Sequence, residues 1–484
     1  MLRESLMPPS SLFSLAAFFL LLVPAVASGS HSCPTPQPPF AYVDVDNDGC
    51  HTDAVDSTSI DAQLQAATTM ANVPSFVAPP GTGLVLPSSL VLPDDADPFW
   101  SVPNDVWIDG QVSGPAGLRI EAGGTTYVNG SIRLKAKGFS DDADLRLGCA
   151  AGCGPTVLDD GVRLGNNGLL AIYDVAIGND VRITVRCEPG GVPSCGGQSF
   201  FARATAIGSG FRLDSPGGIH FEEGVSPLTI GDGARFTTKA VSTDGGTLGF
   251  PISMELAAGV TFGSDARLRA GGSMTVQGGE SSFPLTGPVG FGAGARLGAS
   301  TLVVRGSSLG FGSGSDLRGR RDIMVSGQLS SVILRAADGP LTLGADTSIA
   351  AGRMYLDAGT GLLDAGAGTR LSTSGASQEI ELTGAQIVVS PGAELSKSTS
   401  DLTPILIAAD SSVSVLSSSI RGAGLNVSVS QAAATISFTG NDVNGEDGRT
   451  AVFTAPGGGV CDLSGSTFGK LGIDTTGCGS VVGP

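Results

Sequence analysis

The tetrapeptide Gly294-Ala295-Arg296-Leu297 returns along the chain in altered forms. Its closer copies are Gly233-Ala234-Arg235-Phe236, Asp265-Ala266-Arg267-Leu268, Gly368-Thr369-Arg370-Leu371 and Gly392-Ala393-Glu394-Leu395, and looser copies end at Leu317, Ile349 and Ile420. The apolar residues that close these copies, called anchors below, lie 32, 29, 20, 32, 22, 24 and 25 residues apart, from residue 236 to residue 420. Self-similarity at a period of about 26 residues indicates a repeat architecture.

Short stretches of alternating apolar and polar residues lie between the anchors. They are Met274-x-Val276, Ile323-x-Val325, Met354-x-Leu356, Ile380-x-Leu382, Leu425-x-Val427-x-Val429 and Ile436-x-Phe438. Alternation sends the apolar side chains of a strand to one side, and Gly, Ser and Asp suit the corners between strands. One rung of this length cannot bury its apolar side alone, so rungs must stack. The pattern predicts an all-β fold, a right-handed parallel β-helix (solenoid), over residues 105–484.

The composition supports this fold over its main competitor. A β-sandwich also offers many short strands, but it usually builds a thick core with Trp and Tyr. This chain of 484 residues has two Trp and four Tyr, against 73 Gly. Hydrophobic residues at 41% are too many for a disordered chain. The net charge of −18 argues against nucleic acid as a partner, because phosphates require a basic surface.

The N-terminus has the features of a cleaved signal peptide. An apolar run from Leu12 to Val23 precedes Ala25-x-Ala27, so we expect residues 1–27 to be removed after Ala27. The run is shorter than the roughly 20 apolar residues that a membrane-spanning helix needs. We therefore expect a secreted or cell-surface protein without a transmembrane segment after signal cleavage.

An acidic loop follows in the segment 28–57. Its candidate calcium ligands are Asp44, Asp46, Asp48, the carbonyl of Cys50, Asp53 and Asp56. Hard oxygen ligands at this spacing, with Gly49 at the turn, suit Ca²⁺. Val55 stands where an EF-hand has its closing carboxylate, and the loop resembles the calcium loops of dockerin-like and thrombospondin-type-3 segments. The resemblance implies a structural Ca²⁺; the alternative is a solvated acidic turn.

All eight cysteines lie beyond the expected signal peptide. An even number in an exported chain favours disulfides. The cysteines form neighbouring couples, for which we predict the pairs Cys33–Cys50, Cys149–Cys153, Cys187–Cys195 and Cys461–Cys478. The alternative is a zinc site made of Cys149, Cys153, Cys187 and Cys195. The segment around Cys461 and Cys478 is also expected to close the last rung.

Residues 58–104 are expected to hold a capping helix, near 58–71, and the first strands. Apolar residues share one helical face there, and Thr58 with Asp61 forms an N-cap pair. The helix, Val77-x-Pro79-Pro80-Gly81-Thr82 and Ser88-x-Leu90-x-Leu92-Pro93 together resemble the N-terminal cap of bacterial pectate-lyase-like β-helices. Gly83 replaces the usual aromatic residue of that family. Stretches 268–276 and 317–327 are similar to repeats of filamentous-haemagglutinin-type adhesins.

No catalytic constellation stands out in the sequence. The only histidines are His31, His51 and His220. The candidate carboxylate pairs are Asp141/Asp142, Asp159/Asp160 and Glu222/Glu223, with Arg318, Arg320 and Arg321 as basic partners, and each is more typical of a solvated loop. We expect an adhesin-like or structural rod with a polysaccharide or cell-surface partner. The alternatives are a polysaccharide lyase or glycoside hydrolase, and a carbohydrate-binding protein without catalysis.

Overall fold

The computed structural model describes part of the chain. The described residues are 75–77, 83–86, 89–92, 98–115, 117–135, 143–186, 198–222, 226–243, 246–279, 285–319, 330–374, 378–397, 403–422 and 424–484. The expected signal peptide, calcium loop and capping helix lie outside them, as do the pairs Cys33–Cys50 and Cys187–Cys195. In the described part of the chain, no helix has the length and apolar character needed to cross a membrane.

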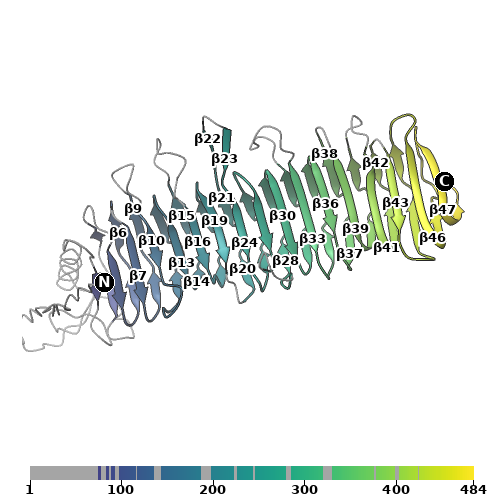
Figure 1. Ribbon diagram of the computed structural model, residues 1–484. Coiled ribbons are helices and arrows are strands. Elements are labelled where there is room, and N and C mark those ends of the chain that lie inside the picture. The colour runs from purple at the N-terminus through teal and green to yellow at the C-terminus, as the bar shows by residue number, and fades with distance from the viewer. Residues whose placement is uncertain are drawn as a thin grey trace, which may run out of the picture.

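The described residues form a parallel β-helix with three strands in each turn. One turn consists of β27 (Met274–Gln277), β28 (Val289–Phe291) and β29 (Arg296–Ala299). Each of these strands pairs in parallel with its counterpart one turn later. The turns stack into an elongated rod, with the earliest strands at one end and β46 and β47 at the other (Figure 1). The predicted fold class is confirmed.

The strands form three columns, called the first, second and third face. The first face contains β1 (Ser75–Val77), β4 (Phe99–Val102), β7 (Leu118–Ala122), β10 (Leu145–Leu147), β13 (Leu170–Tyr173), β16 (Gln198–Ala202), β19 (Gly218–Glu222), β24 (Ile252–Glu255), β27, β30 (Thr301–Gly306), β33 (Ser331–Ala336), β36 (Arg353–Asp357), β39 (Glu379–Val389), β41 (Ile405–Leu416), β43 (Leu425–Val429), β46 (Thr450–Asp462) and β47 (Gly472–Val482). The second face contains β2 (Leu84–Leu86), β5 (Val106–Ile108), β8 (Thr126–Val128), β11 (Thr156–Leu158), β14 (Val175–Ile177), β17 (Ala206–Ile207), β20 (Leu228–Ile230), β25 (Val260–Phe262), β28, β31 (Leu309–Phe311), β34 (Leu341–Leu343), β37 (Leu362–Ala365), β44 (Thr435–Thr439) and the later parts of β39, β41, β46 and β47.

The third face is a separate sheet of fifteen strands. It contains β3 (Leu90–Val91), β6 (Gln111–Gly114), β9 (Ser131–Leu134), β12 (Arg163–Asn166), β15 (Arg182–Val185), β18 (Arg212–Asp214), β21 (Arg235–Thr237), β26 (Arg267–Arg269), β29, β32 (Asp316–Gly319), β35 (Ser348–Ala351), β38 (Arg370–Thr373), β40 (Glu394–Ser396), β42 (Ser419–Arg421) and β45 (Asp442–Asn444). The only antiparallel pair among the described strands is the hairpin of β22 (Ala240–Thr243) and β23 (Gly246–Gly249), which projects from the rod (Figure 1).

The repeated tetrapeptide is the corner that leads into the third face. Gly294 has a φ of 71°, a left-handed conformation that glycine adopts without a Cβ clash. Asp265 and Asp346 occupy the same place in other rungs with φ values of 57° and 58°, which aspartate tolerates better than most residues. The next position, Ala295, is buried, the arginine points to solvent, and the anchor Leu297 is buried again. Each position of the tetrapeptide therefore has its own structural reason.

The anchors form one buried column on the third face. From residue 236 to residue 420, each anchor pairs directly with the next: Phe236, Leu268, Leu297, Leu317, Ile349, Leu371, Leu395 and Ile420. The spacing between anchors is thus the length of each rung, as the sequence predicts. The predicted alternating strands are also confirmed with their apolar residues buried, except 323–325, which lies outside the described residues.

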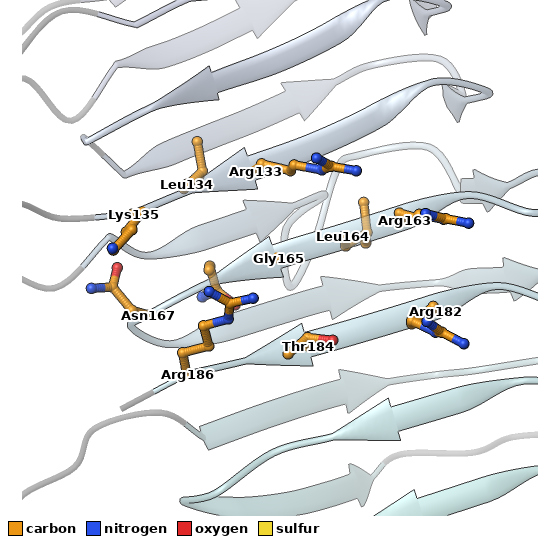
Figure 2. A pocket seen from close by; sticks show the side chains of 11 residues that line it. Arg133, Leu134, Lys135, Arg163, Leu164, Gly165, Asn167, Arg182, Thr184 and Arg186 are labelled. Atoms are coloured by element: carbon orange, nitrogen blue, oxygen red, sulfur yellow. The ribbon is translucent and has the colours of Figure 1, made fainter. Parts of the chain in front are cut away.

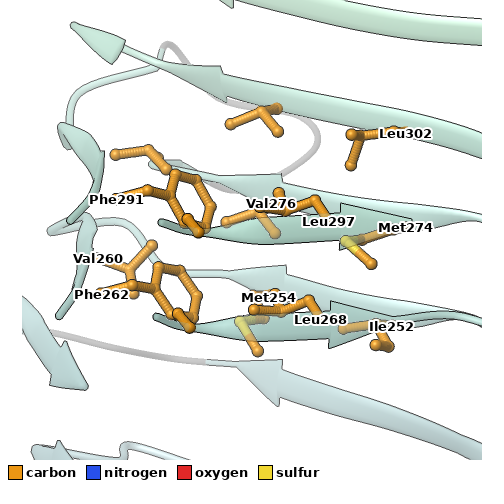
Figure 3. Packing of buried hydrophobic residues seen from close by; sticks show 14 of the residues in the cluster. Ile252, Met254, Val260, Phe262, Leu268, Met274, Val276, Phe291, Leu297 and Leu302 are labelled. Atoms are coloured by element: carbon orange, nitrogen blue, oxygen red, sulfur yellow. The ribbon is translucent and has the colours of Figure 1, made fainter. Parts of the chain in front are cut away.

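Like residues stack on one another in the core. The rings of Phe262 and Phe291 are 4.5 Å apart and nearly parallel, at 5°, and those of Phe291 and Phe311 are 5.0 Å apart, at 4°. These distances follow from the spacing of about 4.8 Å between paired strands. Figure 3 shows Phe262 and Phe291 beside the buried residues Met254 and Met274 of the first face.

Two predicted disulfides are confirmed. Cys149 and Cys153 are bonded across a short loop, and Cys461 of β46 is bonded to Cys478 of β47. The second bond joins the last two strands of the rod, and Cys461 is fully buried. Because a sulfur in a disulfide cannot act as a thiolate ligand, the alternative zinc site with Cys149 and Cys153 is wrong.

Candidate functional site

Six consecutive rungs place an arginine at the same outward position of the third face. The residues, called the arginine column below, are Arg163, Arg182, Arg212, Arg235, Arg267 and Arg296. Each is the third residue of a tetrapeptide corner and pairs in register with the arginine of the next rung. All six side chains are exposed. The column is continuous because the buried anchors beside it are in register.

No described residue forms an ion pair with any of these six arginines. The next rung differs, because Asp316 follows Arg296 in register and binds Arg318 at 2.9 Å. Like charges directly opposite each other destabilise a sheet. Two unit charges about 4.8 Å apart in water repel by about 0.9 kcal/mol. Sheet stability therefore gives no reason for six stacked arginines in a chain with a net charge of −18.

More cationic side chains surround the N-terminal end of the column. A groove of about 500 Å³ is lined by Arg133 and Lys135 from β9 and its end, by Arg163 and Arg182 of the column, and by Arg186 after β15. Figure 2 shows Arg163 and Arg182 one above the other at the start of their strands, with Lys135 and Arg186 at the far end. Among the described residues that line the groove, none is acidic. It therefore extends the positive surface across the width of the third face.

This surface is suited to a linear polymer of negative charges. A guanidinium group presents five donors in a planar fork that matches carboxylate, sulfate and phosphate groups. A polyanion lying along the rod meets one such fork in each rung. The bound anions would also remove the repulsion between neighbouring arginines. A single small anion would use only one or two of the six positions.

Sequence analysis did not identify the arginine column. The signal was present in the repeated tetrapeptide, whose third residue is an arginine in all six rungs from Arg163 to Arg296. The first members, Arg163, Arg182 and Arg212, precede the rungs in which the repeat is easiest to recognise. Their alignment becomes visible only once the strands are paired.

A second cluster of ionisable groups lies on the first face. Tyr355 of β36 donates a hydrogen bond to Glu379 of β39, and it pairs in register with Glu381. Asp357 accepts a hydrogen bond from Thr383 at 3.1 Å. Burial, followed by the charges of Glu379 and Asp357, raises the pKa of Glu381. Burial and the bond to Glu379 raise the pKa of Tyr355 to about 12. Glu381 therefore keeps its proton to a higher pH than an exposed glutamate does.

Replacing Glu381 by glutamine is expected to stabilise the protein at neutral pH. Folding raises the pKa of the Glu381 carboxyl group above its unfolded value, near 4.5. The contribution of this group to stability is therefore fully present below the unfolded pKa, and it is lost as the pH rises through the folded pKa. The unfolding temperature of Glu381→Gln should exceed that of the wild type at pH 7, and the difference should vanish at acidic pH. The exposed corner residue Asp338, changed to asparagine, is the control. A destabilised Glu381→Gln at pH 7 would contradict the assignment.

The carboxylate pairs considered from the sequence have other roles where they are described. Asp160 accepts a hydrogen bond from the backbone N–H of Asn179 at 2.5 Å, and Asp159 accepts one from the backbone N–H of Asp160 at 2.8 Å. Both therefore stabilise a corner. Arg318 is paired with Asp316, which raises the pKa of its guanidinium group. The pair Asp141/Asp142, and also Glu223, Arg320 and Arg321, lie outside the described residues.

The predicted calcium ligands, from Asp44 to Asp56, also lie outside the described residues, and calcium binding stays a prediction. Among the described residues, one group of possible metal ligands occurs, formed by Glu121, Cys149 and Cys153. Both cysteines of this group are in a disulfide. The group therefore offers one carboxylate and no thiolate, which is too few ligands for a structural metal ion.

Comparisons with protein-family profiles, curated proteins and solved structures find no match to this chain. The fold is therefore established by the strand pairing alone. The resemblances to pectate-lyase-like caps, to haemagglutinin-type repeats and to calcium loops stay predictions.

Proposed function

We propose that this protein is an exported, adhesin-like rod that binds an acidic polysaccharide along its third face. The observation that carries the proposal is the arginine column, Arg163 to Arg296, six exposed guanidinium groups in register without ion pairs to described residues. A rigid stack of rungs holds these groups at a fixed spacing, so a long polymer binds without ordering the protein.

Export supports a polysaccharide as the polyanion. The N-terminal signal pattern and the two observed disulfides fit an oxidising compartment outside the cytosol. Linear polyanions there include polymers of uronic acids and sulfated sugars. The net charge of −18 repels every polyanion at long range, so the preference for a polysaccharide over nucleic acid rests on the predicted export. The predicted calcium loop would stabilise the N-terminal end of the rod in such a compartment.

A second candidate function, cleavage of the polysaccharide, is favoured by one observation. Glu379 and Glu381 lie on the same side of β39, and the pKa of Glu381 is raised. Glycoside hydrolases need a carboxyl group that stays protonated to act as a general acid. Arg335 is 3.4 Å from Asp357 at the edge of this cluster. The binding function ranks first because it uses six aligned residues.

One set of incubations tests both functions. The protein is mixed with polygalacturonate, a sulfated polysaccharide, neutral dextran or single-stranded DNA, and binding and polymer length are measured. We expect binding to the two acidic polysaccharides, and we expect it to be lost at about 1 M salt, where the screening length falls to about 3 Å. Dextran binding of equal strength, or preference for DNA, would overturn the proposal. Shortened chains would favour the enzyme, and Glu381→Gln should then abolish them.

A further inference from the structure

The arginine column has a defined length, because the rungs on either side carry no cation at the same position. Ser131 precedes Arg163 in register, and Asp316 follows Arg296. Ser131 is uncharged, and the Asp316 carboxylate is bound by Arg318, whose Nε and Nη2 each lie 2.9 Å from one of its oxygens. With rungs about 4.8 Å apart, the six guanidinium groups span about 24 Å. The column therefore fits a short segment of a polymer.

Another line of outward residues runs beside the arginine column on the third face. It stands two residues further along each strand and is called the second column below: Gly165, Thr184, Asp214, Thr237, Arg269 and Gly298. Figure 2 shows Gly165 and Thr184 on the same strands as Arg163 and Arg182. Because a strand advances about 3.3 Å per residue, the two columns lie about 6.6 Å apart. A polymer on this face therefore meets guanidinium groups at one edge and the second column at the other.

Asp214 is the only acidic residue in either column. Its side chain is exposed, and a threonine pairs with it in register on each side, Thr184 and Thr237. Arg212 is two residues earlier on β18, but these two side chains form no ion pair. No described residue donates a hydrogen bond to the Asp214 carboxylate. It is therefore free to accept hydrogen bonds from a ligand, and it repels an anion that comes close.

We propose that the arginine column takes a segment of about six sugars with one acidic group each, and that Asp214 makes this selection. The inference rests on the proposed function of the column. In a 1,4-linked chain, a uronic acid unit has its carboxylate at one edge of the pyranose ring and two hydroxyl groups at the opposite edge. When the carboxylate faces Arg212, a hydroxyl group on the far edge donates to Asp214. The threonine hydroxyl groups beside Asp214 interact with either edge of a sugar.

A sugar with sulfate groups at both edges of its ring fits this rung less well. When one sulfate faces Arg212, the other lies against the Asp214 carboxylate, and like charges across an interface suppress binding of the wrong partner. In water, two unit charges about 5 Å apart repel enough to weaken binding about fourfold, and the effect is larger near a protein surface, where the effective dielectric constant is lower. Asp214 is therefore a specificity-determining residue, and the arginine column supplies the affinity.

The length of the segment is tested with oligomers of galacturonic acid, titrated by calorimetry into the full chain at low salt. The probes are the trimer, the hexamer and the nonamer. We expect the hexamer to bind at least tenfold more tightly than the trimer, because it reaches all six arginines. The nonamer should gain no more than about fourfold over the hexamer, since it has four ways to place six units on the column. An equal gain at both steps would overturn the six-unit segment.

The selection is tested with Asp214→Asn and two hexamers, one of galacturonic acid and one of heparin type with several sulfate groups per disaccharide. The variant should bind the sulfated hexamer at least fourfold more tightly than the wild type does. It should bind the uronate hexamer within twofold of the wild type, because the asparagine carbonyl still accepts a hydrogen bond from a hydroxyl group. The matched control is Asp338→Asn, which removes the same charge from an exposed corner after the first face and should leave the ratio of the two affinities unchanged.

The outcomes separate this inference from the proposed function. If Asp214→Asn tightens both hexamers equally, or changes neither, the selection by Asp214 is overturned while polysaccharide binding stands. If the folded wild type binds neither hexamer and no polygalacturonate, the binding function is overturned and the selection with it. A change in the affinity ratio with Asp214→Asn, and none with Asp338→Asn, is the result that supports the inference.

Discussion

Changing Arg212, Arg235 and Arg267 together to glutamine is expected to weaken binding of an acidic polysaccharide roughly a hundredfold. These residues occupy three consecutive rungs in the middle of the arginine column. A basic side chain at an anionic surface contributes about 1 kcal/mol, and about 3 kcal/mol corresponds to a factor of about one hundred in Kd. The measurement is titration with polygalacturonate at low salt, repeated at rising salt, where the variant should show a shallower salt dependence.

The control for this experiment changes the same charge on another face. Arg119, Arg146 and Arg305 are on the first face, in β7, β10 and β30. Their triple replacement by glutamine should change affinity less than threefold, because it removes the same charge from a different face and also breaks the ion pairs Arg119–Glu121 and Arg146–Asp144. If both triple variants lose affinity equally, the polymer responds to net charge and the column is not the binding site. The column variant should fold at least as stably as the wild type, since it removes repulsion between stacked like charges.

Changing Phe291 to alanine is expected to destabilise the rod by about 3–5 kcal/mol. Phe291 is 5% exposed and lies between Phe262 and Phe311, with its ring stacked on both. Its loss leaves a cavity that reaches two neighbouring rungs, and a stack of rigid backbones cannot collapse to fill it. In a repeat protein each rung is stabilised by its neighbours, so the damage should extend beyond β28. Guanidinium unfolding measures the total effect.

Hydrogen exchange locates the same effect along the rod. Faster exchange is expected in the strands around Phe262, Phe291 and Phe311, and unchanged exchange in β43 to β47. Phe291→Leu, which keeps most of the buried volume, should cost less than half as much. A uniform loss of protection along the whole rod would show that the rod unfolds as one cooperative unit and would contradict the expectation of local damage.

The sequence by itself determined that this chain forms short rungs that stack on one another. The tetrapeptide ending at Leu297 repeats because each rung needs a left-handed corner residue and a buried anchor, and both requirements are local. The spacing of the anchors therefore predicts the rung lengths, and neighbouring cysteines predict Cys149–Cys153 and Cys461–Cys478. These features depend on residues close together in the chain, or on a pattern that every rung must satisfy.

Only the tertiary structure decided which surface residues meet. Consecutive members of the arginine column are 19 to 32 residues apart, because extra residues leave the rod at the corners, as the hairpin of β22 and β23 does between Phe236 and Leu268. No copy of the repeat recognised in the sequence brings Arg182 beside Arg212, or Trp107 beside Tyr127. The buried anchors align the rungs, and this alignment places outward residues in columns. The proposed binding surfaces depend on this register, because core packing constrains the buried position in every rung but does not constrain the exposed ones.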